Sequence, residues 1–208
     1  NWNILIGFPG ETDEDYRQQI QLVKLLLHLP PPECVGDLWL ERFSPYYTRP
    51  EEYGVTITGP GEAYPYVYDS EDIDLFRIAY DFEFTTQNEI DPALKKELTE
   101  TVQKWKARHQ SDDLPYLFFT KSMNFVTVYD DRSIGNPNKN RFEGAPAWII
   151  VFCNESPKTM DQIKKHVQGL GAEEAAAEQG VLQLEKMGIL YGEKGKYLTL
   201  ALPHNANL

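Results

Sequence analysis

The sequence predicts an α/β protein with two domains, at residues 1–110 and 111–208. Three observations lead to this prediction. A short apolar strand, an amphipathic helix and a second strand follow one another at the start of the chain. A long helix then ends in a polar stretch, which marks the domain boundary. Beyond it, a hairpin precedes three helices and a second hairpin.

Residues 1–43 predict a strand–helix–strand unit. Residues 4–6 are a continuous apolar run, which is typical of a strand buried on both faces in a parallel sheet. We expect a helix over residues 12–28 with Thr12 as its N-cap, and a second strand over residues 37–43. In this spacing the strands lie parallel, joined by a right-handed crossover. Their unpaired edge favours a homodimer or pairing elsewhere within the chain.

The middle of the chain predicts an irregular segment, a strand and a long helix. Residues 44–70 are rich in Pro, Gly and Tyr and are expected to be ordered but irregular. Apolar residues alternate over residues 76–84, which indicates a half-buried strand, although residues 70–75 could open a short helix. Residues 91–109 form a helix with an aspartate N-cap and a proline at its first position. Its apolar stripe consists of Leu94, Leu98, Val102 and Trp105.

The C-terminal part predicts a winged-helix-like α+β module. The expected elements are a hairpin, a polar loop, three helices and a second hairpin, over residues 116–129, 131–144, 146–153, 156–167, 173–187 and 189–200. Ser156 is expected to cap the second of these helices. Three helices followed by a two-stranded wing is the element order of a winged helix.

Composition excludes several classes of protein. With 41% hydrophobic residues the chain can build a core, and its net charge of -12 opposes binding to a phosphate backbone. An acidic surface suits a basic partner, or serves solubility alone. Cys34 and Cys153 are far apart, so the sequence predicts free thiols in a cytoplasmic protein and no metal site. No apolar run is long enough to cross a membrane, and no signal peptide is recognisable.

The strongest short motif is GFPGET at residues 7–12, followed by acidic residues at 13–15. A strand that ends in a Gly-rich turn at a helix N-terminus brings backbone groups close to a ligand at the carboxyl edge of the sheet. By itself, such a turn is more often a tight connection without a ligand.

The residues of this motif resemble those of a known family. Residues 3–12 (NILIGFPGET) and 40–47 (LERFSPYY) resemble the fifth and sixth strands of the barrel of radical S-adenosylmethionine (SAM) enzymes, notably the cobalamin-dependent and methylthiotransferase branches. Residues 50–54 and 80–84 extend the resemblance to enzymes that mature ribosomally made peptides. The resemblance implies the C-terminal strands and helices of a partial TIM-type barrel, followed by the winged-helix-like module. It also implies an enzyme that modifies a precursor peptide, for example by C-methylation.

The family binds SAM, a [4Fe-4S] cluster and, in this branch, cobalamin. The Cys-x-x-x-Cys-x-x-Cys loop that holds the cluster is not in this sequence, and neither is the cobalamin-binding domain. The chain also begins inside an expected strand without an initiator Met. We therefore expect a fragment that is inactive alone, with no bound cofactor, no catalytic residue and no metal ligand of its own.

In the family, the ends of the fifth and sixth strands contact the adenine of SAM. Carried over, these positions are Ile6, Gly7, Phe8, Glu41, Arg42 and Phe43. The spacing of Gly7 and Glu11 departs from the family pattern, so Glu11 is expected to stabilise the helix N-terminus instead of contacting a ligand. Tyr46 and Tyr47 follow the second strand and either contact substrate or pack against the barrel.

Two other functions fit the C-terminal module. It could bind a peptide or protein by strand addition, or act as a nucleic-acid regulator. Its third helix carries Glu173, Glu174 and Glu178 with no base nearby, which argues against DNA. Several apolar residues either line a peptide groove or belong to the core: Tyr116, Phe118, Phe125, Tyr129, Val181, Leu184 and Met187.

Overall fold

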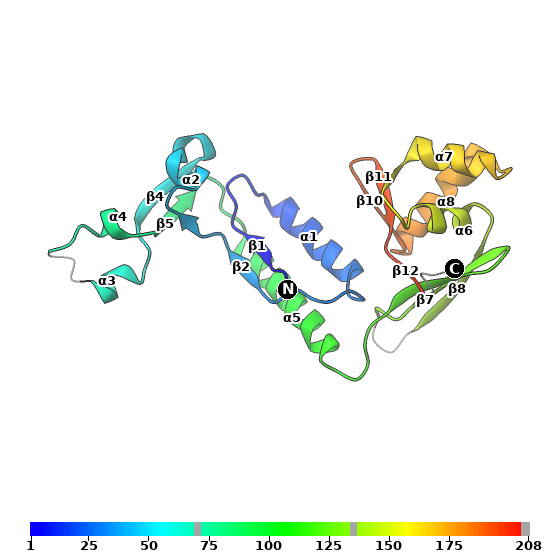
Figure 1. Cartoon of the computed structure of the whole chain (residues 1–208), viewed down its shortest axis with the longest axis horizontal. Helices are drawn as coiled ribbons and strands as arrows, with labels where there is room; N and C mark the ends of the chain where they lie inside the picture. The colour runs from blue at the N-terminus through cyan, green and yellow to red at the C-terminus, as the bar shows by residue number, and fades with distance from the viewer. Residues whose placement is uncertain (69–71, 134–136, 205–208) are drawn as a thin grey trace. The chain divides into compact units, whose positions relative to one another are not determined.

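The computed structural model describes residues 1–68, 72–133 and 137–204. Within these residues the protein is a mixed α/β structure with four small sheets and eight α-helices, and they form no closed barrel. Contacts divide the chain into two compact units, each described by itself below (Figure 1). The N-terminal unit comprises Asn1–Leu22 and Pro31–Lys106, and the C-terminal unit comprises Val23–Pro30 and Ala107–Leu208. No helix in the described ranges is long and apolar enough to span a bilayer.

The predicted strand–helix–strand unit is confirmed. Strand β1 (Ile4–Ile6) pairs in parallel with β2 (Val35–Asp37), and helix α1 (Asp13–Leu25) connects them. The expected cap is also present, because the Thr12 hydroxyl oxygen accepts a hydrogen bond from the backbone N–H of Asp15 at 3.4 Å. In return, the backbone N–H of Thr12 donates to the Asp15 carboxylate at 2.8 Å. Hydrogen bonds from the Thr12 side chain and backbone lower the pKa of Asp15, so this carboxylate stays charged at the positive end of the helix.

Two expectations about these strands are wrong. Leu5 is 50% exposed, so β1 is buried on one face and not on both. The expected strand at residues 37–43 is two strands in different sheets, β2 and the short β3 (Leu40–Glu41). The chain changes sheet because Leu40 is fully buried in a cluster with Val55 and Phe82, away from β1.

An antiparallel sheet of order β3-β5-β4 follows. Its longer strands and the short helices around them are β4 (Val55–Pro60), β5 (Asp81–Thr86), α2 (Pro45–Thr48), the 3-10 helix η1 (Pro50–Tyr53), α3 (Tyr64–Val67) and α4 (Leu75–Ile78). Residues 44–70 are therefore not irregular throughout. The strand expected from residue 76 begins instead as α4, because the alternating Phe76, Ile78 and Tyr80 remain about half exposed and share no buried face.

Helix α5 (Pro92–His109) agrees with the sequence. The Asp91 carboxylate accepts a hydrogen bond from the N–H of Ala93 at 2.8 Å, as expected of an N-cap. All four residues of the predicted apolar stripe are buried.

The C-terminal unit contains a four-stranded sheet of order β12-β6-β7-β8. Its strands are β6 (Leu117–Lys121), β7 (Phe125–Asp130), β8 (Asn138–Glu143) and β12 (Leu202–Pro203). The predicted β6–β7 hairpin is confirmed. The polar loop expected over residues 131–144 is corrected, because residues 138–143 form β8; residues 134–136 lie outside the described ranges. Phe142 is the single buried side chain of β8, which explains why its sequence reads as a loop.

Three helices lie on one side of this sheet (Figure 1). The first of them packs against β7 and β8, and the other two pack against the first. They are α6 (Ala145–Phe152), α7 (Met160–Gly169) and α8 (Glu174–Lys186). A second sheet, of order β10-β11-β9, consists of β10 (Leu190–Glu193), β11 (Lys196–Thr199) and β9 (Lys158–Thr159). Ser156 is not the cap of α7. Thr159 and Gln162 form a reciprocal capping box there, and the Thr-x-x-Gln spacing explains the later start.

The segment Val23–Pro30 belongs to the C-terminal unit, although it begins within the last turn of α1. Arg132 holds it in place, because its guanidinium donates to the carbonyls of Leu25 and Gly188 at 2.8 and 2.9 Å. The Nε2 atom of His28 lies 2.9 Å from the carbonyl of Leu200. Its Nδ1 atom is buried and has no hydrogen-bond partner in the described structure. Burial, which the adjacent carbonyl only partly offsets, lowers the pKa of His28 to about 4.

From the lowered pKa of His28 we predict that the protein loses stability as the pH falls. The folded-state pKa of about 4 lies below the ordinary value of 6.5, so protons bind the unfolded chain more tightly. The contribution is complete above pH 6.5 and declines as the pH falls toward 4. In the His28→Gln variant, the free energy of unfolding should fall with pH by about 2 kcal/mol less than in the parent. Urea unfolding followed on the amide signal of Val128 measures this, and identical pH profiles would contradict it.

Candidate functional site

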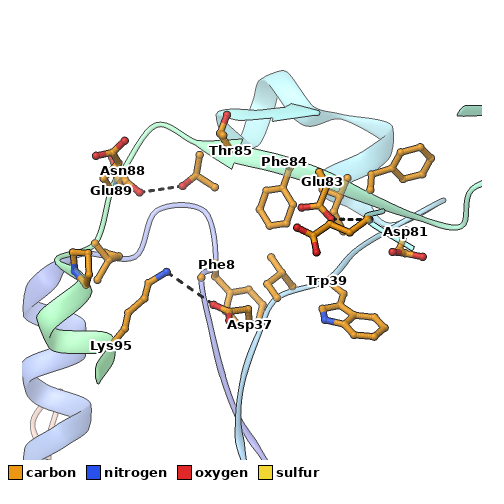
Figure 2. A pocket seen from close by; sticks show the side chains of 18 of the residues that line it. Phe8, Asp37, Trp39, Asp81, Glu83, Phe84, Thr85, Asn88, Glu89 and Lys95 are labelled. Atoms are coloured by element: carbon orange, nitrogen blue, oxygen red, sulfur yellow. Dashed lines mark hydrogen bonds and ion pairs between the residues drawn. The ribbon is translucent and has the colours of Figure 1, made fainter. Parts of the chain in front are cut away.

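The carboxyl ends of β1 and β2 open onto a cavity of about 870 Å³, here called the β1–β2 cavity (Figure 2). Gly7 and Phe8 line it at the end of β1, and residues 37–40 line it where β2 leads into β3. Strand β5 supplies the facing wall. All lining residues belong to the N-terminal unit. In open α/β sheets ligands bind at this edge, and the volume lies within the usual range of ligand pockets.

The turn beside the cavity is held by Glu11. Gly7 and Gly10 adopt φ angles of 85° and 89°, which favour glycine. The Glu11 carboxylate accepts hydrogen bonds from the N–H groups of Gly7 and Phe8, at 2.9 and 3.2 Å. It also accepts one from the hydroxyl of buried Tyr16 at 2.9 Å. Burial and the adjacent Glu11 raise the pKa of Tyr16, so its hydroxyl remains a donor.

The expected role of Glu11 is thereby corrected. Its carboxylate turns back to the strand end and not to the N–H groups of the first helical turn. The reason is that the N–H groups of Gly7 and Phe8 lie past the end of β1, where no partner strand accepts their hydrogen bonds.

The six residues expected to contact adenine do not lie together. Gly7 and Phe8 line the β1–β2 cavity, whereas the buried Ile6 borders a smaller cavity beside α5. Glu41, Arg42 and Phe43 follow β2 but are not among the residues that line the β1–β2 cavity. Phe43 has a φ of 73° and is 76% exposed.

Arg42 has partners within the protein. Its guanidinium donates to the carbonyl of Ala79 at 2.6 Å, to the hydroxyl of Tyr47 at 3.1 Å and to the carbonyl of Phe76. It lies over the rings of Tyr47 and Phe82, at 5.3 and 5.0 Å from their centres. Arg42 therefore joins β3 to the segment that precedes β5. Tyr47 packs in the same cluster.

Carboxylates dominate the lining of the cavity. They come from Asp37, Glu62, Asp81, Glu83 and Glu89, and Lys95 is the single base among the described lining residues. The Lys95 ammonium lies 4.0 Å from the Asp37 carboxylate. Aromatic rings of Phe8, Trp39, Phe82 and Phe84 complete the walls, and Trp39 is 74% exposed. Sequence reasoning missed Trp39 and the acidic residues of β5, because only the pairing of β3 with β5 brings them together.

The carboxylates of the lining favour binding of a cation. The lining contains neither His nor Cys. Among the described residues, no group of three His, Cys, Asp or Glu side chains could hold a metal ion. Cys34 is exposed, and burial raises the pKa of Cys153 to about 12. A comparison with known protein families, curated proteins and solved structures finds no match for this chain.

Because the Glu11 carboxylate accepts three hydrogen bonds, we predict that replacing it strongly lowers the stability of the protein. Glu11→Ala leaves the N–H of Phe8 and the buried Tyr16 hydroxyl without an acceptor, whereas the N–H of Gly7 still donates to the Tyr16 hydroxyl oxygen at 3.0 Å. The substitution should lower the free energy of unfolding by roughly 2 to 3 kcal/mol. Glu11→Gln keeps one acceptor oxygen and should cost about 1 kcal/mol. Glu14→Ala removes an exposed carboxylate of the first helical turn and should cost less than about 1 kcal/mol.

Urea unfolding of the three variants, with hydrogen exchange of the Gly7 amide, measures these effects. Exchange should accelerate in Glu11→Ala and remain at the parental rate in Glu14→Ala. Equal losses of stability in the two alanine variants would show that Glu11 has no special role.

Proposed function

We propose that the N-terminal unit forms part of the SAM-binding site of a radical SAM enzyme, of the cobalamin-dependent branch that matures ribosomally made peptides. The observation that carries the proposal is the β1–β2 cavity, which lies at the strand ends where the GFPGET motif begins. Parallel strands joined by a helix, as in β1, α1 and β2, also occur in TIM-type barrels. Residues 40–41, which resemble the start of the sixth strand, pair instead with β5 in an antiparallel sheet. The [4Fe-4S] cluster and cobalamin would belong to other parts of the parent enzyme, so this chain alone would be inactive.

The residues of the cavity fit the chemistry of SAM. Its adenine is a flat ring that the exposed face of Trp39 and the ring of Phe8 can stack against. Its sulfonium and ammonium groups are cations, which the Asp37 carboxylate favours. At a reduced cluster, SAM supplies the radical that starts the reaction. The role of this chain would be to orient SAM and to keep water away from it.

Titration with SAM tests this proposal. The proposal departs from the expectation that the chain alone binds no cofactor. The chain should bind SAM, and Trp39→Ala should weaken binding about tenfold through the lost stacking. S-adenosylhomocysteine, which lacks the sulfonium charge, should bind more weakly than SAM. Tyr66→Ala is the matched control, because Tyr66 is 91% exposed and does not line the cavity. Calorimetry measures all four affinities, and SAM binding that is absent or insensitive to Trp39→Ala refutes the proposal.

A second candidate function concerns the C-terminal unit. We propose that it is a winged-helix-like module that binds a peptide, such as the precursor substrate, by strand addition. Strand β8 is the outermost strand of its sheet, and its free edge pairs with no described strand. Exposed strand edges accept extended peptides through backbone hydrogen bonds. Lys139 on β8 favours an acidic peptide, whereas the Arg141 guanidinium pairs with Glu143 of the same strand at 2.7 Å.

The face of the sheet away from the helices carries stacked rings. The ring of Phe118 lies 4.9 Å from Tyr129 and 5.5 Å from Tyr116. The ammonium of Lys139 lies 5.2 Å from the Tyr129 ring. Side chains of an added strand could contact this row. The other proposed groove residues, Val181 and Leu184, are buried in the core and cannot line a groove.

The acidic helix α8 disfavours the nucleic-acid alternative. The expectation that its glutamates lack a nearby base is corrected, because Lys164 lies 2.5 Å from Glu178 and 3.8 Å from Glu174. These carboxylates raise the pKa of Lys164 and hold its charge. Two glutamates facing one lysine leave the helix acidic, and a phosphate backbone would be repelled.

Titration with random-sequence duplex DNA at low salt is the most stringent test of the nucleic-acid alternative, since low salt favours any electrostatic binding. We expect no binding at micromolar concentrations, measured by fluorescence anisotropy of labelled DNA. The Lys164→Glu variant should behave in the same way. Micromolar or tighter binding by the parent would overturn the peptide-binding assignment in favour of a regulator.

The edge of β1 that faces away from β2 is a further surface on which another strand could pair. In the described sheets β1 pairs with β2 alone. We propose that a second copy of the chain covers this edge, and that the protein works in the cytoplasm.

A further inference from the structure

Phe43 combines an unfavourable backbone conformation with an exposed aromatic ring. It is the third residue of a turn that the N–H of Ser44 closes by donating to the carbonyl of Glu41 at 3.1 Å. Its φ of 73° lies in the left-handed region, where glycine or asparagine is normally found in such a turn. The ring is 76% exposed, so burial against the described residues does not offset the strain. Strained residues of this kind are concentrated at functional sites.

Arg42 joins this turn to a segment with three further exposed apolar residues. They are Phe76 and Ile78 of α4 and the nearby Tyr80, each between 44 and 52% exposed. The backbone N–H of Arg42 donates to the carbonyl of Tyr80 at 2.6 Å, and its guanidinium donates to the carbonyl of Phe76. Phe43 and these three residues, here called the Phe43 patch, are therefore held in one region of the N-terminal unit. They are not among the residues that line the β1–β2 cavity.

The charge of the N-terminal unit selects among the possible partners of this patch. The C-terminal unit has equal numbers of acidic and basic residues, so the net charge of -12 belongs to the N-terminal unit. Exposed Glu41, Asp72 and Asp74, here called the acidic rim, adjoin the patch in the sequence. The same patch of a second copy would bring like charges together, and an anionic lipid surface would be repelled. A cationic protein partner is therefore favoured.

We propose that the Phe43 patch binds a basic segment of a partner protein. An apolar residue of that segment lies against Phe43, and flanking lysines or arginines face the acidic rim. Exposed apolar surface rimmed by polar residues is typical of interaction sites, and complementary charge makes the encounter faster and more specific. The inference goes beyond the proposed SAM site and does not depend on it, because the patch lies outside the β1–β2 cavity.

The strained turn allows a binding role of Phe43 to be separated from a structural role. Phe43→Gly relieves the positive φ, so the midpoint of thermal unfolding should rise by roughly 2 to 4 °C. Asparagine also tolerates this conformation, so Phe43→Asn should be at least as stable as the parent. Both variants lose the ring. A rise in stability together with a loss of binding would indicate a residue that serves the partner and not the fold.

The probes are three acetylated, amidated hexapeptides. The first is Gly-Lys-Leu-Leu-Lys-Gly, and its two analogues carry glutamates in place of the lysines or serines in place of the leucines. Binding to the full chain is followed by NMR on the amides of Phe76 and Tyr80. The first peptide should bind about tenfold more tightly than either analogue, and added salt should reduce its advantage over the glutamate peptide.

Variants of the patch and of the rim test the two contacts separately. Phe43→Gly and Phe43→Asn should each weaken binding of the first peptide about tenfold. Glu41→Gln combined with Asp74→Asn should also weaken it and should reduce its dependence on salt. Met123→Ser is the matched control, because Met123 is an exposed apolar residue of the C-terminal unit, and it should leave binding unchanged.

Three results would overturn the proposal. The first is equal binding of the first peptide and either analogue, or no binding of the first peptide at about 1 mM. The second is parental binding by Phe43→Gly. The third is an unfolding midpoint of Phe43→Gly at or below that of the parent, since the residue would then serve the fold.

Discussion

The Glu11 carboxylate joins the three segments on which the candidate site depends: the end of β1, the turn and the start of α1. It accepts hydrogen bonds from two backbone N–H groups past the strand end and from the Tyr16 hydroxyl of the helix. Without Glu11, the Phe8 N–H and the Tyr16 hydroxyl would be left partly buried without an acceptor, at a cost of about 1 to 3 kcal/mol each. The Gly7 N–H also donates to the Tyr16 hydroxyl oxygen, at 3.0 Å. The glycines at 7 and 10 permit the positive φ angles that bring Glu11 back to the strand. The turn at Gly7 and Phe8, which borders the cavity, is therefore held in place before any ligand binds.

The cavity itself depends on a change of sheet. After β2 the chain leaves its parallel partner, because Leu40 is buried with Val55 and Phe82 in a separate cluster. Leu40 then pairs opposite Phe82, which sets β5 against the ends of β1 and β2. The alternation along β5 places Phe82 in the cluster, while the exposed Glu83 lines the cavity. The burial of Leu40 thus accounts for both the cavity and the β5 carboxylates that line it.

Local patterns predicted the elements whose signals lie within a few residues. The β1–α1–β2 unit, the stripe of α5 and the three C-terminal helices follow from apolar periodicity and caps. The strand β8 could not be predicted, because Phe142 is its only buried side chain. Nor could the place of residues 23–30, which depends on the distant Arg132 and its hydrogen bond to Leu25. For the site, the sequence indicated Gly7 and Phe8, but Trp39 and Glu83 meet only through long-range strand pairing.

The central claim is that the β1–β2 cavity is the ligand site of the N-terminal unit. Amide chemical shifts of the uniformly labelled chain, recorded as SAM is added, test it most directly. The account predicts that the largest changes cluster at Gly7, Phe8, Leu38 and Trp39, which line the cavity. It also predicts that the signals of β6, β7 and β8 remain in place. Changes centred on those three strands, or spread evenly over the chain, would contradict the account.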